Sequence, residues 1–168
     1  CDDFHTSTRL FFKLELSLER ESTLHFFDRI RREYPALKRL RRREGNTLVL
    51  EESDSDSRSE AQRWVRLEPA AMRFGHFAPA SGDECRQFAG FLLEQAPYHL
   101  TLTELDVDYL EVFFGFDMEY SGNHDQLVAD TLFRDHPLAS FIMADDCAHT
   151  IDCQPYFGIA LTPRCDVQ

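Results

Sequence analysis

The sequence lacks the short motifs that identify many enzyme classes. It contains no G-x-S-x-G elbow for a serine nucleophile, and no G-x-G-x-x-G or Walker loop for nucleotide phosphates. It has no C-x-x-C pair, so the strongest zinc and redox patterns are missing as well. No run of 18 apolar residues is present, and we therefore expect no transmembrane span. These absences favour a binding or assembly module over an enzyme.

The five cysteines do not form a recognisable disulfide framework. Their number is odd and their spacing is irregular, so we expect reduced thiols, as in a cytoplasmic protein. No basic segment followed by an apolar stretch opens the chain, and thus no secretory signal is visible. Because the chain begins with Cys1 rather than Met, we expect that it is trimmed at one or both ends.

The sequence does contain enough apolar material for one core. Its 168 residues are 43% hydrophobic and include 15 Phe, so we expect a single domain over residues 1–168. The formal net charge of −12 argues against a general affinity for nucleic acid or anionic membranes. Residues 51–60 contain no hydrophobic side chain and are expected to form an acidic, Ser-rich, mobile loop.

Positive charge is concentrated in a basic band, residues 29–43, which holds eight basic side chains and one acid. Such a band in an acidic protein indicates a binding surface. Nucleic-acid binding also needs aromatic rings for stacking, and Tyr34, the one aromatic in the band, fits the apolar stripe of a helix. We therefore expect the basic band to bind a protein partner or a second copy of the chain rather than nucleic acid. The alternative is that the acids of loop 51–60 neutralise the band within the same chain. The predicted charged contacts are Arg39, Arg41, Arg42 and Arg43.

Hydrophobic periodicity and capping residues predict the order of elements. The first half should contain a strand, a helix ended by Pro35 and two hairpins: Thr8–Leu18, Ser22–Tyr34, Leu37–Leu50 and Arg63–Phe74. The second half should contain a capped helix ended by Pro97, a long strand, another capped helix and a last strand: Ser81–Ala96, Leu100–Tyr120, Asn123–Phe133 and Pro155–Leu161. This order predicts an α+β fold, with helices on one face of a mainly antiparallel sheet. A ferredoxin-like or split β-α-β core is the first prediction, and a helix-grip fold is the alternative.

The long strand has the strongest strand composition in the chain, and we expect it to be central and largely buried. Its apolar positions change phase, from odd numbers up to Tyr109 to even numbers from Leu110 onwards. A β-bulge or sharp bend near this dipeptide would reconcile the two phases, and Gly115 is a candidate for a second bend. The second arm should supply Phe114, Phe116 and Met118 to the core.

Two groups of residues have metal-ligand chemistry. The first group is Glu104, Asp106 and Asp108, which occupy alternate positions of the long strand and therefore share one face. Their carboxylates suit Mg²⁺ or Ca²⁺. A solvated face, or pairing with the basic arm 38–43, explains these acids too. The second group is Cys147, His149 and Cys153 near the C-terminus. Their thiols and imidazole suit Zn²⁺, although their spacing fits no zinc-finger pattern. A metal-dependent enzyme or a metal-stabilised domain is therefore an alternative function. A third is a small-ligand pocket between the Phe-rich sheet face and the helices.

Three segments follow one another in a suggestive order. A helix ends at Arg32-Glu33-Tyr34-Pro35, the strand pair Val65–Pro69 and Met72–Phe74 comes next, and the long strand Thr103–Tyr109 comes after a further helix. In this order the chain resembles a sporadically distributed bacterial family of uncharacterised α+β proteins. The likeness covers residues 8 to about 135 and rests on core patterning. It implies an α+β fold and a longer C-terminal part, and it brings no known activity or catalytic residues.

Overall fold

The computed structural model describes residues 3–17, 19–52, 62–137, 139 and 150–156. They belong to two compact units, residues 1–118 and 119–168. The first unit holds a six-stranded antiparallel sheet with two helices, so the α+β class expected from the sequence is confirmed. The expectation of a single domain over the whole chain stays a prediction. No helix in the described part of the chain has the length and apolar character needed to cross a membrane.

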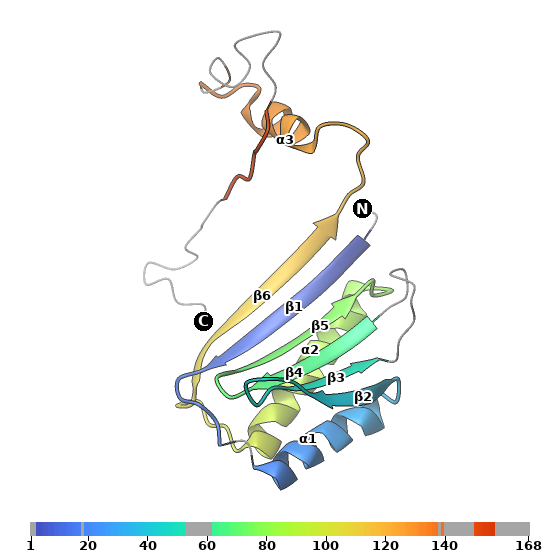
Figure 1. Cartoon of the computed structure of the whole chain (residues 1–168), viewed down its shortest axis with the longest axis vertical. Helices are drawn as coiled ribbons and strands as arrows, with labels where there is room; N and C mark the ends of the chain where they lie inside the picture. Colours follow the sequence, from blue (N-terminus) through green and yellow to red (C-terminus); the bar gives the residue numbers. More distant parts are fainter. Residues whose placement is uncertain (1–2, 18, 53–61, 138, 140–149, 157–168) are drawn as a thin grey trace. The chain divides into compact units, whose positions relative to one another are not determined.

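The sheet of the first unit has the spatial order β2-β3-β4-β5-β1-β6. Helices α1 (Arg20–Glu33) and α2 (Gly82–Leu100) cover one of its faces, and the other face is open (Figure 1). Strands β1 and β2, which α1 connects, run parallel with three other strands between them. The choice between a ferredoxin-like or split β-α-β core and a helix-grip fold stays a prediction. The strands are β1 (Asp3–Phe12), β2 (Leu37–Arg42), β3 (Leu48–Glu52), β4 (Gln62–Glu68), β5 (Ala71–Phe77) and β6 (Val107–Asp117).

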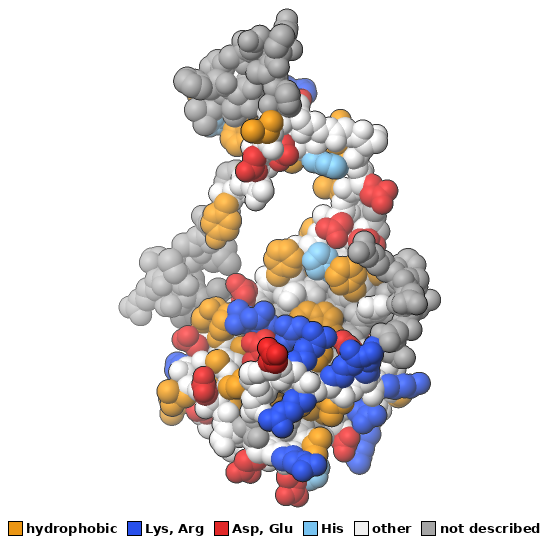
Figure 2. All heavy atoms as spheres, viewed as in Figure 1, with side chains coloured by type: hydrophobic (Ala, Val, Ile, Leu, Met, Phe, Trp, Pro, Cys, Tyr) orange, Lys and Arg blue, Asp and Glu red, His pale blue; other side chains and the backbone are white. Residues whose placement is uncertain are grey.

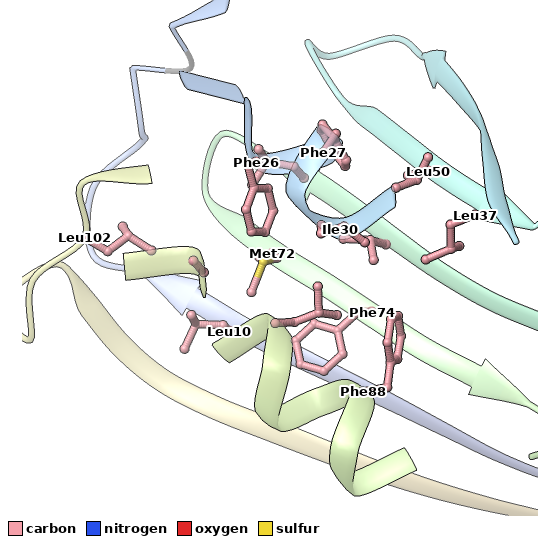
Figure 3. Packing of buried hydrophobic residues seen from close by; sticks show 14 of the residues in the cluster. Leu10, Phe26, Phe27, Ile30, Leu37, Leu50, Met72, Phe74, Phe88 and Leu102 are labelled. Atoms are coloured by element: carbon pink, nitrogen blue, oxygen red, sulfur yellow. The ribbon is translucent and has the colours of Figure 1, made fainter. Parts of the chain in front are cut away.

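The hydrophobic core lies between the two helices and strands β1 to β5. Met72 and Phe74 of β5 point towards the helices, and Phe26 of α1 and Phe88 of α2 meet them (Figure 3). All four side chains are at most 1% exposed. Close packing of this kind makes the first unit a rigid support for whatever the open face carries.

Local turn and capping signals in the sequence are realised in the structure. Gly45 and Asn46 both have positive φ, 69° and 57°, and they connect β2 to β3 as the hairpin prediction required. Ser81 caps α2, because its Oγ accepts a hydrogen bond from the Glu84 backbone at 3.3 Å. The basic arm β2 lies at an edge of the sheet, where charged side chains hinder pairing with another strand.

Two helix boundaries differ from the prediction. Helix α1 begins at Arg20 rather than after Ser22, since the carbonyl of Glu19 already accepts the Thr23 amide at 3.0 Å. Helix α2 runs through Pro97 and ends at Thr101, whose φ is 55°. Proline at position 97 forgoes one intrahelical donor, but its own carbonyl accepts the amide of Leu102 at 3.0 Å, which completes the last turn.

The prediction of a central, buried long strand is wrong. Residues 101–106 form turns, and β6 begins only at Val107 and lies at the sheet edge beside β1. Phe114, Phe116 and Met118 do not enter the core; they are 58%, 61% and 72% exposed. The predicted bulge is confirmed, because β1 pairs Leu10 with Leu110 but Phe12 with Val107. Gly115 stays in register with β1 and bends nothing.

The second unit contains α3 (His124–Phe133). Its predicted cap is confirmed, since the Asn123 side chain accepts the Gln126 amide at 3.1 Å. Asn123 and Gln126 also hold both backbone groups of Thr150, at 2.8 Å each. Most of the strand expected over Pro155–Leu161 lies outside the described residues.

Candidate binding face

The open face of the sheet carries arginines from several strands in one cross-strand row. From β2 to β6 the row reads, each residue directly opposite the next, Arg41, Val49, Arg66, Arg73, Arg9 and Glu111. Directly opposite residues of antiparallel strands share a face, and neighbouring strands lie about 4.8 Å apart. Figure 2 shows Lys and Arg side chains gathered on one face of this unit. We call these residues, with Arg39, the arginine row.

The arginine row places three positive charges side by side. Arg66, Arg73 and Arg9 belong to consecutive strands, and like charges directly opposite each other destabilise a sheet. One carboxylate, Glu68, serves two of them, at 3.9 Å from Arg66 and 3.5 Å from Arg73. The Nε atoms of Arg9 and Arg66 are buried without a hydrogen-bond partner, and the buried Nε of Arg73 has only the Glu68 carboxylate, at 3.5 Å. The row is therefore a set of donors that its own side chains satisfy poorly.

At the β2 end, a second carboxylate, Glu51, pairs with arginines of the row. Glu51 Oε1 lies 3.8 Å from Arg39 and 3.6 Å from Arg41, so one carboxylate again faces two guanidinium groups. Beneath the row, Val49 is on the open face and is still only 3% exposed.

Aromatic side chains flank the row on both sides. On one side, Phe11 and Tyr109 stack with centroids 4.1 Å apart, and the Arg9 guanidinium lies 3.9 Å above the Phe11 ring. On the other side, Trp64 of β4 is directly opposite Gly75 of β5. A Cβ at position 75 would be 2.8 Å from the indole, so the glycine allows the Trp64 ring to lie against the sheet.

A second aromatic group continues this side of the face. His5 stacks on Phe77 at 4.9 Å and contacts Phe113 at 5.6 Å between ring centroids. Gly115 makes room for it, because a Cβ there would be 2.1 Å from the His5 ring. Arginine, tryptophan and other aromatic residues are the types enriched at the energetic centres of protein interfaces. The open face thus has the composition of a binding surface.

The structure brings only part of the basic band to this face. Arg39 and Arg41 join the arginine row, whereas Arg42 turns back to the hairpin and donates to Asn46 Oδ1 at 2.7 Å. Arg43 lies at the hairpin end, where with Arg66 it lines a shallow depression of about 570 Å³. Sequence reasoning missed Arg9, Arg66 and Arg73 as site residues, because they are far apart in the chain and only the strand register assembles them.

The acidic metal candidates do not form one stripe. Only Asp108 lies in β6, while Glu104 and Asp106 belong to the preceding turn. Asp106 closes that turn by accepting the Thr103 amide at 2.8 Å and its hydroxyl at 2.6 Å, and these bonds lower its pKa. Cys147 and His149 lie outside the described residues, and Cys153 is a free thiol. Within the part that is described, no group of three or more His, Cys, Asp or Glu residues is arranged to hold a metal.

A buried polar cluster lies under the helices instead. Arg63 of β4 forms ion pairs with Glu84 of α2 and with Glu52 of β3, the latter at 3.1 Å. The completely buried His76 lies beside it, with its Nδ1 4.0 Å from the Cys85 thiol. Burial lowers the pKa of His76 below its ordinary 6.5, and Arg63 lowers it further while Glu84 opposes the shift. The cluster ties α2 to the sheet through neutral imidazole and paired charges.

This lowered pKa predicts that the protein loses stability in mild acid. Because folded His76 resists protonation, the unfolded chain binds more protons as the pH falls below about 6.5, and the free energy of unfolding decreases. The pKa of His99 is lowered as well and adds to the same trend. Urea unfolding between pH 7.5 and pH 5 measures it, and the variant His76→Gln should show a shallower dependence. An equally steep dependence in that variant would contradict the assignment.

A groove of about 310 Å³ lies between α2 and the last two strands of the sheet. Thr6 and Thr8 of β1, Cys85 of α2, and Val112 and Phe114 of β6 line it. The small-ligand site predicted between the sheet and the helices stays a prediction, and the core side chains fill the centre of that layer.

Neither a protein-family model nor a curated protein sequence matches this chain. The bacterial family resemblance therefore stays a prediction, and function has to be argued from the site.

Proposed function

We propose that this protein is a binding module that docks an acidic segment of a partner protein on the open face of its sheet. The arginine row carries the proposal, since three arginines of adjacent strands lie side by side and Glu68 is the one carboxylate paired with any of them among the described residues. A carboxylate accepts from a guanidinium group in a bidentate, charge-assisted manner, and this would relieve the repulsion within the row. The free thiols of Cys85 and Cys153 support a cytoplasmic location.

Two observations favour a protein partner over nucleic acid. Carboxylates are interleaved with the arginines, Glu51 and Glu68 in ion pairs and Glu111 at the end of the row. The flanking rings pair with each other or with arginine, as Phe11 does with both Tyr109 and Arg9. Short-range, geometrically defined contacts to a few carboxylates suit such a surface better than a continuous phosphate backbone does.

Reversing two charges of the row should abolish this binding. In the double variant Arg66→Glu, Arg73→Glu, we expect the affinity for a fluorescein-labelled oligo-glutamate peptide to fall more than about tenfold, since charge-assisted hydrogen bonds contribute about 1.5–3 kcal/mol each. Fluorescence anisotropy at low and at physiological salt measures it. The matched control is Arg31→Glu, Arg32→Glu on α1, which changes the net charge equally but alters no residue of the arginine row.

The two double variants separate a built site from general charge attraction. If both double variants weaken peptide binding equally, the proposal is contradicted. It is also contradicted if neither double variant changes the affinity of the wild type. A labelled oligouridylate of the same length, measured under the same conditions, tests the other class of anion. Tighter binding of the oligouridylate, lost in the Arg66/Arg73 variant alone, would replace the protein partner with single-stranded nucleic acid.

A further inference from the structure

Strand β6 is an edge strand with only one partner in the described sheet, β1. It is eleven residues long and contains no proline, lysine or arginine. Natural proteins use those residues, or short strands, to keep an exposed edge from pairing with another strand. The edge of β6 therefore lacks the features that prevent pairing, although its backbone groups on that side are unused within the described sheet.

Both faces of β6 expose apolar side chains. On the helix face, Leu110, Val112 and Phe114 are 45%, 49% and 58% exposed. On the open face, Tyr109 and Phe113 are 51% and 55% exposed. An incoming strand must therefore be apolar on both of its own faces to cover them. Strand β6 itself meets this requirement.

The hydrogen-bond pattern of β1 shows which groups of β6 are free. Phe12 N donates to Ala70 O, and Ala78 N donates to Phe4 O, both at 2.9 Å, so even-numbered residues of β1 bond to β5. Odd-numbered residues of β1 then bond to β6, and Ser7 pairs there with Phe113. By the same alternation, the N–H and C=O groups of Val112 and Phe114 point to the outer edge.

We propose that a second copy of this chain pairs with β6 in an antiparallel, two-fold symmetric register centred on Phe113. This register sets Val112 opposite Phe114 of the other copy as a hydrogen-bonded pair, and Leu110 opposite Phe116. Phe113 meets its own counterpart at the axis. Every directly opposite pair of the helix face is then apolar, and side chains of one face stay on that face, as a two-fold axis normal to the sheet requires.

Charge supports this register. The acids of β6 are Asp108, Glu111 and Asp117. With Phe113 on the axis, Glu111 faces Gly115 of the other copy and Asp117 faces Tyr109, so no carboxylate meets another. A register moved by two residues in each copy towards the N-terminus, centred on Glu111, would place two carboxylates together and is disfavoured. The charge pattern of the strand thus fits its own copy when Phe113 is at the centre.

The inference goes beyond the proposed function and does not depend on it. Pairing through β6 would join two sheets edge to edge and leave both arginine rows on the same side. A partner protein with two acidic segments would then engage both rows, and the second contact would gain from its high effective concentration. A chain that dimerises without binding the acidic peptide would support only the β6 inference, and a monomer that binds the peptide would support only the proposed function.

The oligomeric state of the full chain tests the inference. We expect sedimentation-velocity centrifugation to show a dimer for the wild type and a monomer for Phe114→Lys, which places a charge opposite Val112 of the other copy. The control Tyr98→Lys changes a side chain of α2 that is 84% exposed and should remain dimeric. A wild-type chain that is monomeric at high micromolar concentration would overturn the inference.

Oxidative cross-linking tests the register. Residues at a non-hydrogen-bonded antiparallel pair have Cα atoms about 4.5 Å apart, which suits a disulfide. We expect Phe113→Cys to form a covalent dimer beyond the background of the native cysteines, and Glu111→Cys to form none. Cross-linking of Glu111→Cys but not of Phe113→Cys would contradict the proposed axis. A dimer that Phe114→Lys leaves intact would refute the β6 interface altogether.

Discussion

Replacing Phe88 with alanine lowers the free energy of unfolding by about 3–5 kcal/mol, the range for deleting a large buried aromatic side chain. Phe88 is 1% exposed and joins three elements of the first unit. Its ring makes edge contacts with Tyr34 after α1 at 5.0 Å and with Phe74 of β5 at 6.2 Å (Figure 3). Alanine would remove these contacts and leave a cavity between the helices and the sheet.

Chemical denaturation with a control in the same helix measures this loss. Tyr98→Ala alters an exposed residue of α2 and should change stability by no more than about 0.5 kcal/mol. Phe88→Leu keeps most of the volume and should lose less than about 1.5 kcal/mol, so the order of effects can be read even if the alanine variant does not fold. A Phe88→Ala loss as small as that of Tyr98→Ala would contradict the packing described here.

Gly75→Ala should disturb both the sheet and the open face. A Cβ at this position would be 2.4 Å from the Thr6 carbonyl and 2.8 Å from the Trp64 ring. Since the carbonyl belongs to the paired backbone of β1, it cannot move without breaking the β1–β5 ladder. We expect a loss of about 1–3 kcal/mol, the usual effect of overpacking, and a changed emission spectrum, because Trp64 is the only tryptophan.

The control for this substitution is Gly90→Ala. Gly90 lies in α2, and an added Cβ there meets nothing within 4 Å. Alanine favours helix over glycine, so this variant should gain about 0.5–1 kcal/mol. Opposite signs for the two glycine substitutions are the outcome that the structure requires. Stabilisation by Gly75→Ala would show that Trp64 does not lie against the sheet.

Local signals account for the parts of the fold that the sequence predicted well. The Gly45-Asn46 hairpin and the caps at Ser81 and Asn123 depend on residues within a few positions of each other, and all three are found in the structure. The phase change at Tyr109-Leu110 is also local, and it locates the bulge. Such features are decided by backbone conformation before any long-range pairing forms.

Strand order is not local, and this is where the sequence misled. A strand that is apolar on both faces is typical of the centre of a sheet, so β6 was expected to be buried. Its position depends instead on which strands β1 pairs with, and β1 is more than ninety residues away in the chain. The arginine row escaped notice for the same reason. Only the strand register shows that Arg66 and Arg73 share a face with Arg9 and Arg41.

The central claim is that the arginine row binds carboxylates, and nuclear magnetic resonance tests it most directly. In a ¹⁵N-labelled chain titrated with the oligo-glutamate peptide, we expect the Nε–Hε signals of Arg9, Arg66 and Arg73 to shift, because carboxylates of the peptide bind the guanidinium groups to which these atoms belong. The Trp64 indole signal should shift with them. Shifts confined to Arg31 and Arg32 of α1, or no shifts at all at saturating peptide, would contradict the claim.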